Sequence, residues 1–346
     1  MQRLQLQRLQ RTVERVYAGV EPYRRLFDEK GIKPSDIRSL EDIRQLPFTT
    51  KALLRDNYPY GLFAVPLREI VRLHASSGTT GQPTVVGYTR NDLEVWSEVI
   101  ARLATQAGVV PEDIAQVTFG YGLFTGAFGL HYGLEKVGAA VVPASAGNTE
   151  KQLALMRDFG TTVLIGTPSY ALHMADVAQS LGMNPAGMDL RLGLFGSEVW
   201  SEEIRGKLEE KWGIRATDNY GLSEIIGPGV AGECTYGRGL MHINEDHFFV
   251  ELIDPETGEP VENGQKGELV ITTLTKEALP LLRYRTRDYS ILTDEPCACG
   301  RTTMRMTKVA GRSDDMLIVS GVNVFPSQIE SVLVNIGGLQ PYYQIV

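Results

Sequence analysis

The sequence predicts an α/β protein in which helices cover a largely parallel sheet. From residue 139 onward short apolar strands alternate with helices, with strands over residues 139–142, 162–165 and 192–195 and helices over residues 150–159, 169–181 and 201–212. Such alternation is typical of a layered domain built on parallel strands. Gly160, Gly182 and Gly213 stand where these helices should end, and Ser201 is a good N-cap for the third helix.

A β-rich region should follow these layers. Residues 248–253 and 267–274 have the composition of strands, and a turn sequence, Asp-Pro-Glu-Thr-Gly at residues 254–258, lies between them. A further short strand is expected over residues 215–218. Because ligands of layered α/β domains bind beyond the carboxyl ends of the strands, residues 196–198 and 219–224 mark the predicted site.

The opening segment predicts an amphipathic helix. Leu9, Val13, Val16 and Val20 recur at helical spacing with arginines between them. A second helix is expected over residues 92–106, where apolar side chains share one face. Both patterns indicate packing against the body of the protein.

Composition excludes several classes of protein. The chain has 346 residues, of which 43% are hydrophobic and 22% charged, as expected for a globular protein of two or three structural units. Its net charge of −8 offers no basic surface for nucleic acid or an acidic membrane. No apolar run approaches ~18 residues and no signal peptide is recognisable, so we expect a cytoplasmic protein. Three cysteines, two of them separated by a single residue, suit a reducing compartment.

A Ser-Ser-Gly-Thr-Thr-Gly run at residues 76–81, here called the anion loop, has the chemistry to hold phosphate oxygens. It is not a Walker loop, because Gln82 and Pro83 follow where that motif has lysine. The flanking residues 70–74 and 84–88 predict strands, so the loop joins two strands. Taken alone, it could equally be an ordinary hairpin turn.

Aromatic residues and glycines are interleaved between residues 117 and 133. Glycines let a flat ligand approach the backbone, and aromatic faces can wall it in. A glycine-rich turn with core aromatics explains the segment equally well.

Four ordered stretches give the chain a specific resemblance. Residues 74–89, His-Ala-Ser-Ser-Gly-Thr-Thr-Gly-Gln-Pro-Thr-Val-Val-Gly-Tyr-Thr, resemble the ATP loop of phenylacetate-CoA ligases, which belong to the adenylate-forming superfamily. Residues 219–224 (Asn-Tyr-Gly-Leu-Ser-Glu), 284–288 (Tyr-Arg-Thr-Arg-Asp) and 311–326 match further motifs of that family. The resemblance implies a large N-terminal adenylation domain over residues 1–313, with layered α/β/α sheets and a β-barrel-like subdomain. Residues 314–346 would then hold a hinge and the start of a small α+β C-terminal domain.

The resemblance also implies an activity. An aryl, phenylacetate-like carboxylic acid would be activated by ATP with Mg²⁺ to an acyl-adenylate and then transferred to coenzyme A. We therefore expect small-molecule partners, neither nucleic acid nor membrane, with a homodimer as one possible assembly. One alternative keeps the adenylation but changes the acid or the acceptor, as with a carrier-protein thiol or in relatives of coenzyme F390 synthetase. Another is a non-catalytic, zinc-containing binding protein.

Adenylation brings a carboxylate against the α-phosphate of ATP, and cations and donors must neutralise their repulsion. Glu224 suits Mg²⁺, which prefers one or two carboxylates together with phosphate oxygens. By resemblance Thr79 and Thr80 would contact phosphate or metal, Tyr220 would lie against the adenine, and Asp288 would bind both ribose hydroxyls. The predicted nucleotide contacts are Ser76, Ser77, Gly78, Thr79, Thr80, Gly81, Gly196, Ser197, Glu198, Asn219, Tyr220, Gly221, Ser223, Asp288 and Arg312.

The same resemblance assigns the aryl-acid pocket. Its predicted residues are Phe119, Tyr121, Phe124, Gly196 and Pro228. Two positions depart from the family pattern. Phe119 stands where the family often has tyrosine, which removes one polar group from the pocket. Gln82 stands where relatives usually carry lysine or arginine, which weakens a contact to the outer phosphates.

The cysteines suggest a structural zinc site. Cys297 and Cys299 lie on one tight Cys-x-Cys-Gly turn, and Cys234 and His242 could complete a Cys₃His set. Some relatives of phenylacetate-CoA ligases carry a similar set as a zinc clip. His247 is the rival fourth ligand, and three unrelated, packed cysteines are the alternative.

The last segment predicts an incomplete lid. By resemblance Asp314 is the hinge of the C-terminal domain, and Arg312 meets the ribose or phosphate. No lysine or arginine follows Asp314, and the family's lid lysine would lie further on. We therefore expect a shortened ligase that binds nucleotide and acid but adenylates slowly.

Overall fold

The structure is a computed structural model and describes residues 1–76, 83–312, 317–319, 322–324, 329 and 333. Its α-helices are α1 (Gln2–Gly19), α2 (Glu21–Lys30), α3 (Lys51–Asp56), α4 (Arg90–Ala107), α5 (Gly126–Val137), α6 (Thr149–Phe159), α7 (Pro168–Ser180) and α8 (Glu202–Trp212). Short 3-10 helices are η1 (Pro34–Asp36), η2 (Glu41–Gln45), η3 (Leu67–Glu69) and η4 (Pro185–Gly187). The strands are β1 (Arg72–Ala75), β2 (Val85–Tyr88), β3 (Ile114–Val117), β4 (Ala140–Val142), β5 (Val163–Gly166), β6 (Leu192–Gly196), β7 (Arg215–Leu222), β8 (Gly227–Glu233), β9 (Leu240–Ile243), β10 (Phe248–Ile253), β11 (Lys266–Thr273), β12 (Tyr284–Thr293), β13 (Arg305–Thr307), β14 (Leu317–Val319) and β15 (Val322–Val324).

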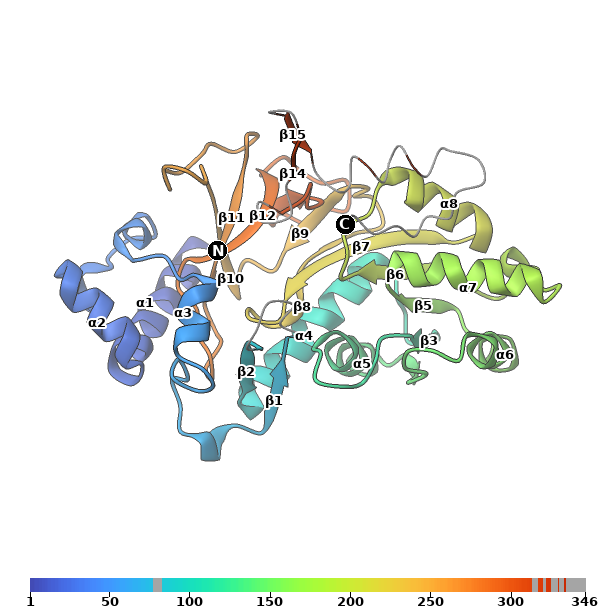
Figure 1. Cartoon of the computed structure of the whole chain (residues 1–346), viewed down its shortest axis with the longest axis horizontal. Helices are drawn as coiled ribbons and strands as arrows, with labels where there is room; N and C mark the ends of the chain where they lie inside the picture. Colours follow the sequence, from blue (N-terminus) through green and yellow to red (C-terminus); the bar gives the residue numbers. More distant parts are fainter. Residues whose placement is uncertain (77–82, 313–316, 320–321, 325–328, 330–332, 334–346) are drawn as a thin grey trace.

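One long sheet organises the molecule (Figure 1). Its strand order is β10-β11-β12-β13-β9-β8-β7-β6-β5-β3-β4. Strands β4, β3, β5, β6 and β7 pair in parallel, and every pair from β7 to β10 is antiparallel. The parallel half confirms the α/β layers that strand-helix alternation predicted. The β-rich region continues the same sheet.

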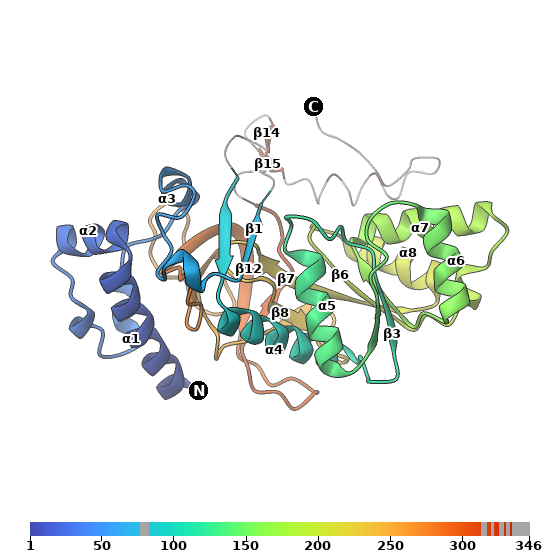
Figure 2. The same cartoon turned by 90° about the horizontal axis from the view of Figure 1, so that it is seen from below.

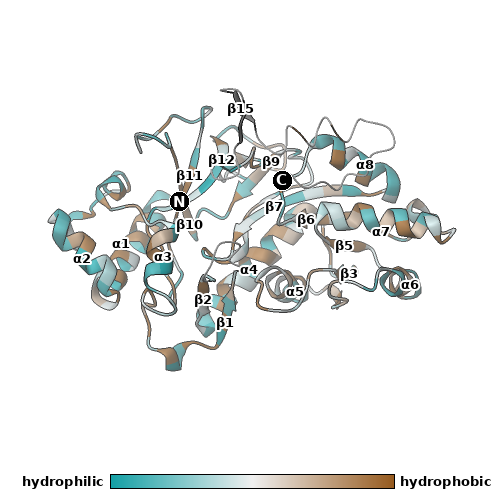
Figure 3. Ribbon diagram, in the orientation of Figure 1, coloured by the Kyte–Doolittle hydropathy of each residue, from teal (hydrophilic) through white to brown (hydrophobic). Residues whose placement is uncertain are grey.

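Helices cover both faces of the parallel half. On β5, Val163 and Ile165 pack into the core that α4 and α5 share, whereas Leu164 packs into a second core with α6, α7 and α8. Because successive strand residues point to opposite faces, burial of all three means that neither face meets solvent. The helices themselves mix hydrophobic and hydrophilic residues along their length (Figure 3).

The N-terminal helix packs as its sequence predicts. Leu9, Val13, Val16 and Val20 are all buried, and the hydroxyl of Thr12 donates to the Leu274 carbonyl at 3.1 Å. Figure 2 shows α1 and α2 at the opposite end of the molecule from α6 and α7. No helix in the described ranges is both long enough and apolar enough to cross a membrane.

Helix α4 and strand β7 extend beyond their predicted limits. Helix α4 begins at Arg90 rather than residue 92, because Thr89 and Asp92 cap each other's backbone amides. Strand β7 continues to Leu222 rather than ending at residue 218, because its far half pairs with β8. Most of the 219–224 motif is therefore strand, and only its last residues turn away.

Lys276 is an unusual member of the core. Its side chain is buried, and its Nζ atom has no hydrogen-bond partner among the described residues. The ammonium lies 3.4 Å from the centre of the Tyr88 ring, a cation–π contact. Burial lowers the pKa of Lys276 to about 7, with the charge of Asp92 opposing the change.

We expect Lys276→Met to raise the free energy of unfolding by about 1–3 kcal/mol at pH 7, because it removes a buried ammonium that lacks a close counter-charge. Between pH 7 and 10.5 the unfolded chain holds a proton that the folded chain releases, so the parent protein gains stability as pH rises. The advantage of the variant should therefore shrink towards pH 10. Urea unfolding at both pH values measures it.

The exposed Lys151 provides the control, since Lys151→Met should change stability little at either pH. A loss of stability in Lys276→Met at pH 7 would show that the contact with Tyr88 outweighs the cost of burial.

Candidate functional site

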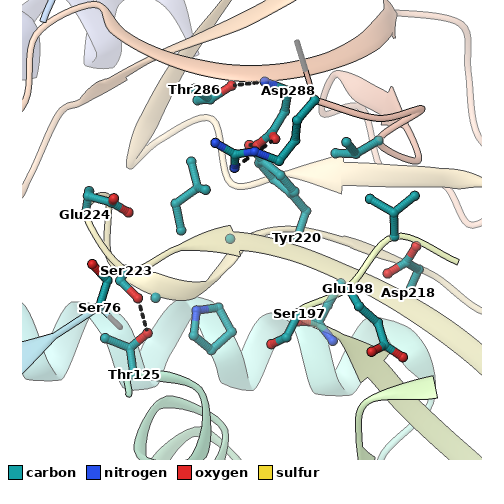
Figure 4. A pocket seen from close by; sticks show the side chains of 18 of the residues that line it. Ser76, Thr125, Ser197, Glu198, Asp218, Tyr220, Ser223, Glu224, Thr286 and Asp288 are labelled. Atoms are coloured by element: carbon teal, nitrogen blue, oxygen red, sulfur yellow. Dashed lines mark hydrogen bonds and ion pairs between the residues drawn. The ribbon is translucent and has the colours of Figure 1, made fainter. Parts of the chain in front are cut away.

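A cavity of about 290 Å³ lies at the carboxyl ends of β6 and β7, with β12 on its other side (Figure 4). This is where strand order and chain direction predict a ligand. The sequence-predicted residues that line it are Ser76, Phe124, Ser197, Glu198, Asn219, Tyr220, Gly221, Ser223, Glu224, Pro228, Asp288 and Arg312. Segments far apart in the sequence therefore meet at one cavity.

Tyr220 and Asp288 meet at one side of the cavity. The Tyr220 hydroxyl donates to Oδ2 of Asp288 at 2.6 Å, and Nη1 of Arg312 lies 3.4 Å from Oδ1. Burial and the nearby Asp288 charge raise the pKa of Tyr220 well above its usual value, so the phenol stays protonated. A carboxylate has about four acceptor sites, so the Asp288 side chain can accept from several donors at once.

Glu224 and Lys51 form the opposite side. The Glu224 side chain is only 8% exposed, and its Oε1 lies 3.9 Å from Nζ of Lys51. Next to it, Thr125 and Ser223 share a hydrogen bond of 3.0 Å between their hydroxyls. An acidic group, an ammonium and two hydroxyls thus converge where phosphate oxygens or a divalent cation could be held.

Ser76 brings the start of the anion loop to this same side (Figure 4). Strands β1 and β2 form the predicted antiparallel pair. Beyond them, the Ser76 amide donates to the Thr84 carbonyl at 3.0 Å, and the Thr84 amide donates to the Ser76 hydroxyl at 3.3 Å. Ser77, Gly78, Thr79, Thr80, Gly81 and Gln82, and the predicted hinge Asp314, lie outside the described residues.

The third side of the cavity is acidic, with an exposed Glu198 and a buried Asp218. Glu198 accepts hydrogen bonds from the Ser169 amide at 2.6 Å and the Ser169 hydroxyl at 2.9 Å, at the start of α7. Burial raises the pKa of Asp218 to about 7. Lys308 also lines this side, with Nζ 4.2 Å from the Trp200 ring centre.

Of the three aromatic residues predicted for the aryl-acid pocket, Phe124 lines the cavity and the other two do not. Phe119 packs behind Phe124, with ring centres 6.3 Å apart. Tyr121 is outside the lining and bonds to Nδ1 of His131 at 2.9 Å. Gly196 also lies behind the wall, where an added Cβ would be 2.7 Å from the Asn219 carbonyl oxygen. Glycine there permits the close approach of β6 and β7.

Several lining residues were not predicted as site residues from the sequence. They are Lys51, Thr125, Val199, Trp200, Asp218, Leu222, Gly227, Met241, Tyr284, Thr286, Lys308 and Val309. Tyr284 and Thr286 belong to the 284–288 motif, and Asp218 directly precedes the 219–224 motif, so proximity to a motif was a usable signal. Lys51 and Lys308 carry no local signal, because only the fold brings them to the cavity.

A second cluster lies apart from the cavity lining. The ligand atoms of Cys234, His242, Cys297 and Cys299 all lie within 4.8 Å of one another. The Sγ atoms of Cys234 and Cys297 are 3.7 Å apart, and Sγ of Cys299 lies 3.3 Å from Nε2 of His242. This Cys₃His donor set and its spacing fit a tetrahedral metal ion such as zinc.

His242 and His247, the two rival ligands, differ in what their rings contact. The Nδ1 atom of His242 lies 3.0 Å from the Thr303 hydroxyl, which leaves Nε2 directed at the cysteines. Burial, with Arg301 and Arg305 nearby, lowers the pKa of His242 to about 4, so the ring is neutral as a metal ligand must be. His247 instead contacts Thr275 and Asp246, at 2.8 and 3.1 Å.

Known families and proteins match this chain over most of its length. The family described as AMP-binding enzyme matches residues 57–275, and that described as AMP-binding enzyme C-terminal domain matches residues 321–346. The phenylacetate-coenzyme A ligase of Thermus thermophilus is 54% identical over 343 residues, which cover 99% of this chain and 77% of that protein. The phenylacetate-coenzyme A ligase of Escherichia coli is 51% identical, over 100% of this chain and 78% of that protein.

Solved structures agree with these matches. A 2-hydroxyisobutyryl-CoA ligase in the postadenylation state, in complex with 2-HIB-AMP, has a TM-score of 0.93 at 29% identity, covering 99% of this chain and 74% of that chain. The same ligase in complex with 2-HIB-AMP and CoA, in the thioesterification state, has a TM-score of 0.87 at 30% identity, covering 97% of this chain and 73% of that chain.

Proposed function

The chain belongs to the phenylacetate-CoA ligase family of AMP-binding enzymes, and we propose that it converts a phenylacetate-like acid, ATP and CoA to the aryl-CoA thioester, AMP and pyrophosphate. The observation that carries this proposal is the convergence of Tyr220, Glu224 and Asp288 on one cavity. Asp288 and Tyr220 offer a ribose acceptor and an aromatic face, and Glu224 faces them from the side where the anion loop begins.

Two displacements make up the reaction. First, a carboxylate oxygen of the acid attacks the α-phosphorus of ATP, and the bond to pyrophosphate breaks, which leaves an acyl-adenylate. Next, the sulfur of CoA attacks the acyl carbon, the thiol loses its proton, and AMP departs with the electrons of the broken bond. The protein must first bring two anions together, so charge neutralisation is its main task.

Lys51 and Glu224 suit this task. The Lys51 ammonium lies next to Glu224 at the cavity, where it can offset the negative charge of the acid and the phosphates. Glu224, with Thr79 or Thr80, would hold Mg²⁺, and a bound Mg²⁺ would neutralise phosphate charge. Asp288 and Arg312 would orient the ribose, and Phe124 and Pro228 would flank the aryl ring.

We propose a zinc ion for the Cys₃His cluster, held by Cys234, His242, Cys297 and Cys299. Its role would be structural, because none of the four lines the cavity. Cys234 directly follows β8, His242 lies on β9, and the other two cysteines lie between β12 and β13. A zinc ion there would join strands that neighbour one another in the long sheet.

The proposed activity is tested by incubating the protein with ATP, Mg²⁺, CoA and phenylacetate and following pyrophosphate and phenylacetyl-CoA. We expect both products from the parent protein. The variant Glu224→Gln should lose at least about tenfold in rate, because the Glu224 carboxylate acts where charge on the phosphates must be neutralised. Its affinity for AMP should change little, because Glu224 does not contact the ribose. Pyrophosphate without consumption of CoA would mean that another acceptor takes the acyl group.

We expect Asp288→Asn to weaken AMP binding by roughly tenfold or more, because hydrogen bonds to a charged acceptor contribute about 1.5–3 kcal/mol. Isothermal titration with AMP measures this. The exposed residue Asp294 offers the matched substitution, and Asp294→Asn should bind AMP as the parent does. Equal affinity of the two variants would remove Asp288 from the nucleotide site.

Metal analysis tests the zinc proposal. Protein purified without chelator should contain close to one zinc per chain, and His242→Ala should contain much less. The variant His247→Ala is the matched control and should keep its zinc, since His247 contacts Thr275 and Asp246 instead. Parent protein with well under one zinc per chain, or zinc loss in both histidine variants alike, would contradict the assignment.

A further inference from the structure

One backbone carbonyl joins two sides of the cavity. The Leu123 carbonyl oxygen accepts from the Ala75 amide at 3.0 Å and lies 2.9 Å from Nδ1 of His74. A carbonyl oxygen can only accept, so His74 must carry a proton on Nδ1. Ser76 directly follows Ala75, the last residue of β1, and Phe124 directly follows Leu123. Ser76 and Phe124 both line the cavity.

The His74 ring is enclosed by aromatic residues. Its exposed fraction is 2%, and it meets Tyr88, Trp96 and Phe128 edge-on, with ring centres 5.6 to 5.9 Å apart. Burial lowers the pKa of His74, so the ring is neutral. Trp96 in turn donates to the carbonyl of Pro228, a cavity residue, at 2.8 Å.

Packing alone does not account for a histidine at this position. Its Nε2 atom is buried without a hydrogen-bond partner among the residues the structure describes, which is unfavourable. A phenyl ring would fill a similar space without that cost. What histidine adds is the Nδ1 hydrogen bond to Leu123.

We propose that His74 is a positioning residue, which fixes Ser76, at the phosphate side of the cavity, relative to Phe124, at the aryl-acid side. This role rests on the proposed function, since it matters only if one ligand spans both sides. An acyl-adenylate does span them, with its phosphate on one side and its aryl ring on the other. AMP alone has no aryl ring to be placed.

Two substitutions separate the hydrogen bond from the packing. His74→Phe keeps a ring of similar size but removes the donor. His74→Asn places an amide nitrogen near the position of Nδ1 and so can restore the donor, but it leaves space between Tyr88, Trp96 and Phe128. A purely structural role would make the asparagine variant worse in every respect.

The test is isothermal titration of each protein with AMP and with a non-hydrolysable phenylacetyl-adenylate analogue, together with thermal melting. We expect His74→Phe to bind AMP as the parent does but to lose about tenfold in affinity for the analogue. His74→Asn should melt at a lower temperature yet keep more of the parent's preference for the analogue over AMP. The exposed His173 supplies the control, and His173→Phe should match the parent.

The outcomes distinguish the two proposals. A parent protein that binds neither ligand overturns the proposed function and the role of His74 with it. A parent that binds both, with an unchanged preference in His74→Phe, overturns only the role of His74. If His74→Phe fails to fold, the test rests on His74→Asn. A His74→Asn variant that has lost the preference for the analogue over AMP then counts against the proposal.

Discussion

Strands β7 and β8 pass so close to each other at Gly221 that the site depends on the absence of a side chain there. A Cβ atom added to Gly221 would lie 2.0 Å from the Gly227 carbonyl oxygen. At the same point the pairing register shifts, between Tyr220 and Gly221. Before the shift Tyr220 reaches Asp288, and after it the chain turns and presents Glu224 next to Lys51. One tight backbone contact thus serves both sides of the cavity.

A buried ion pair supports β7 from beneath. Arg205 and Glu233 form a bidentate ion pair with hydrogen bonds of 2.6 and 2.8 Å, and each side chain is only 1% exposed. Both partners also bind the strand, because Arg205 donates to the Ala216 carbonyl and Glu233 accepts from the Asp218 amide. Such a pair is costly to bury and costly to break, so it holds the strand in one position. The Asp218 carboxyl group is thereby kept in a buried place where its pKa rises to about 7.

Local patterns predicted the elements, and motifs predicted many of the cavity residues. Spacing identified the buried face of α1, and the anion loop lies between two strands as its flanks indicated. No local pattern in the sequence indicated which distant segments would pair with or contact one another. The extension of β7 depends on β8, and the arrival of Lys51 at Glu224 depends on how α3 is placed. The resemblance assigns Tyr121 to the acid pocket, and its hydroxyl lies 2.9 Å from Nδ1 of His131.

The curvature of the long sheet brings Asp288 to Tyr220 at the cavity, and the Cys₃His cluster lies on the curved part. Between β7 and β12 the order runs through β8, β9 and β13, so four strand spacings separate Tyr220 from Asp288. In a flat sheet four spacings amount to ~19 Å, yet the two side chains are joined by a hydrogen bond of 2.6 Å. The sheet must therefore curl strongly across β8, β9 and β13. The Cys₃His cluster draws its ligands from β9 and from the segments that follow β8 and β12. The four residues of this cluster therefore lie in the same part of the sheet, between β8 and β12, that curls to bring Asp288 to Tyr220.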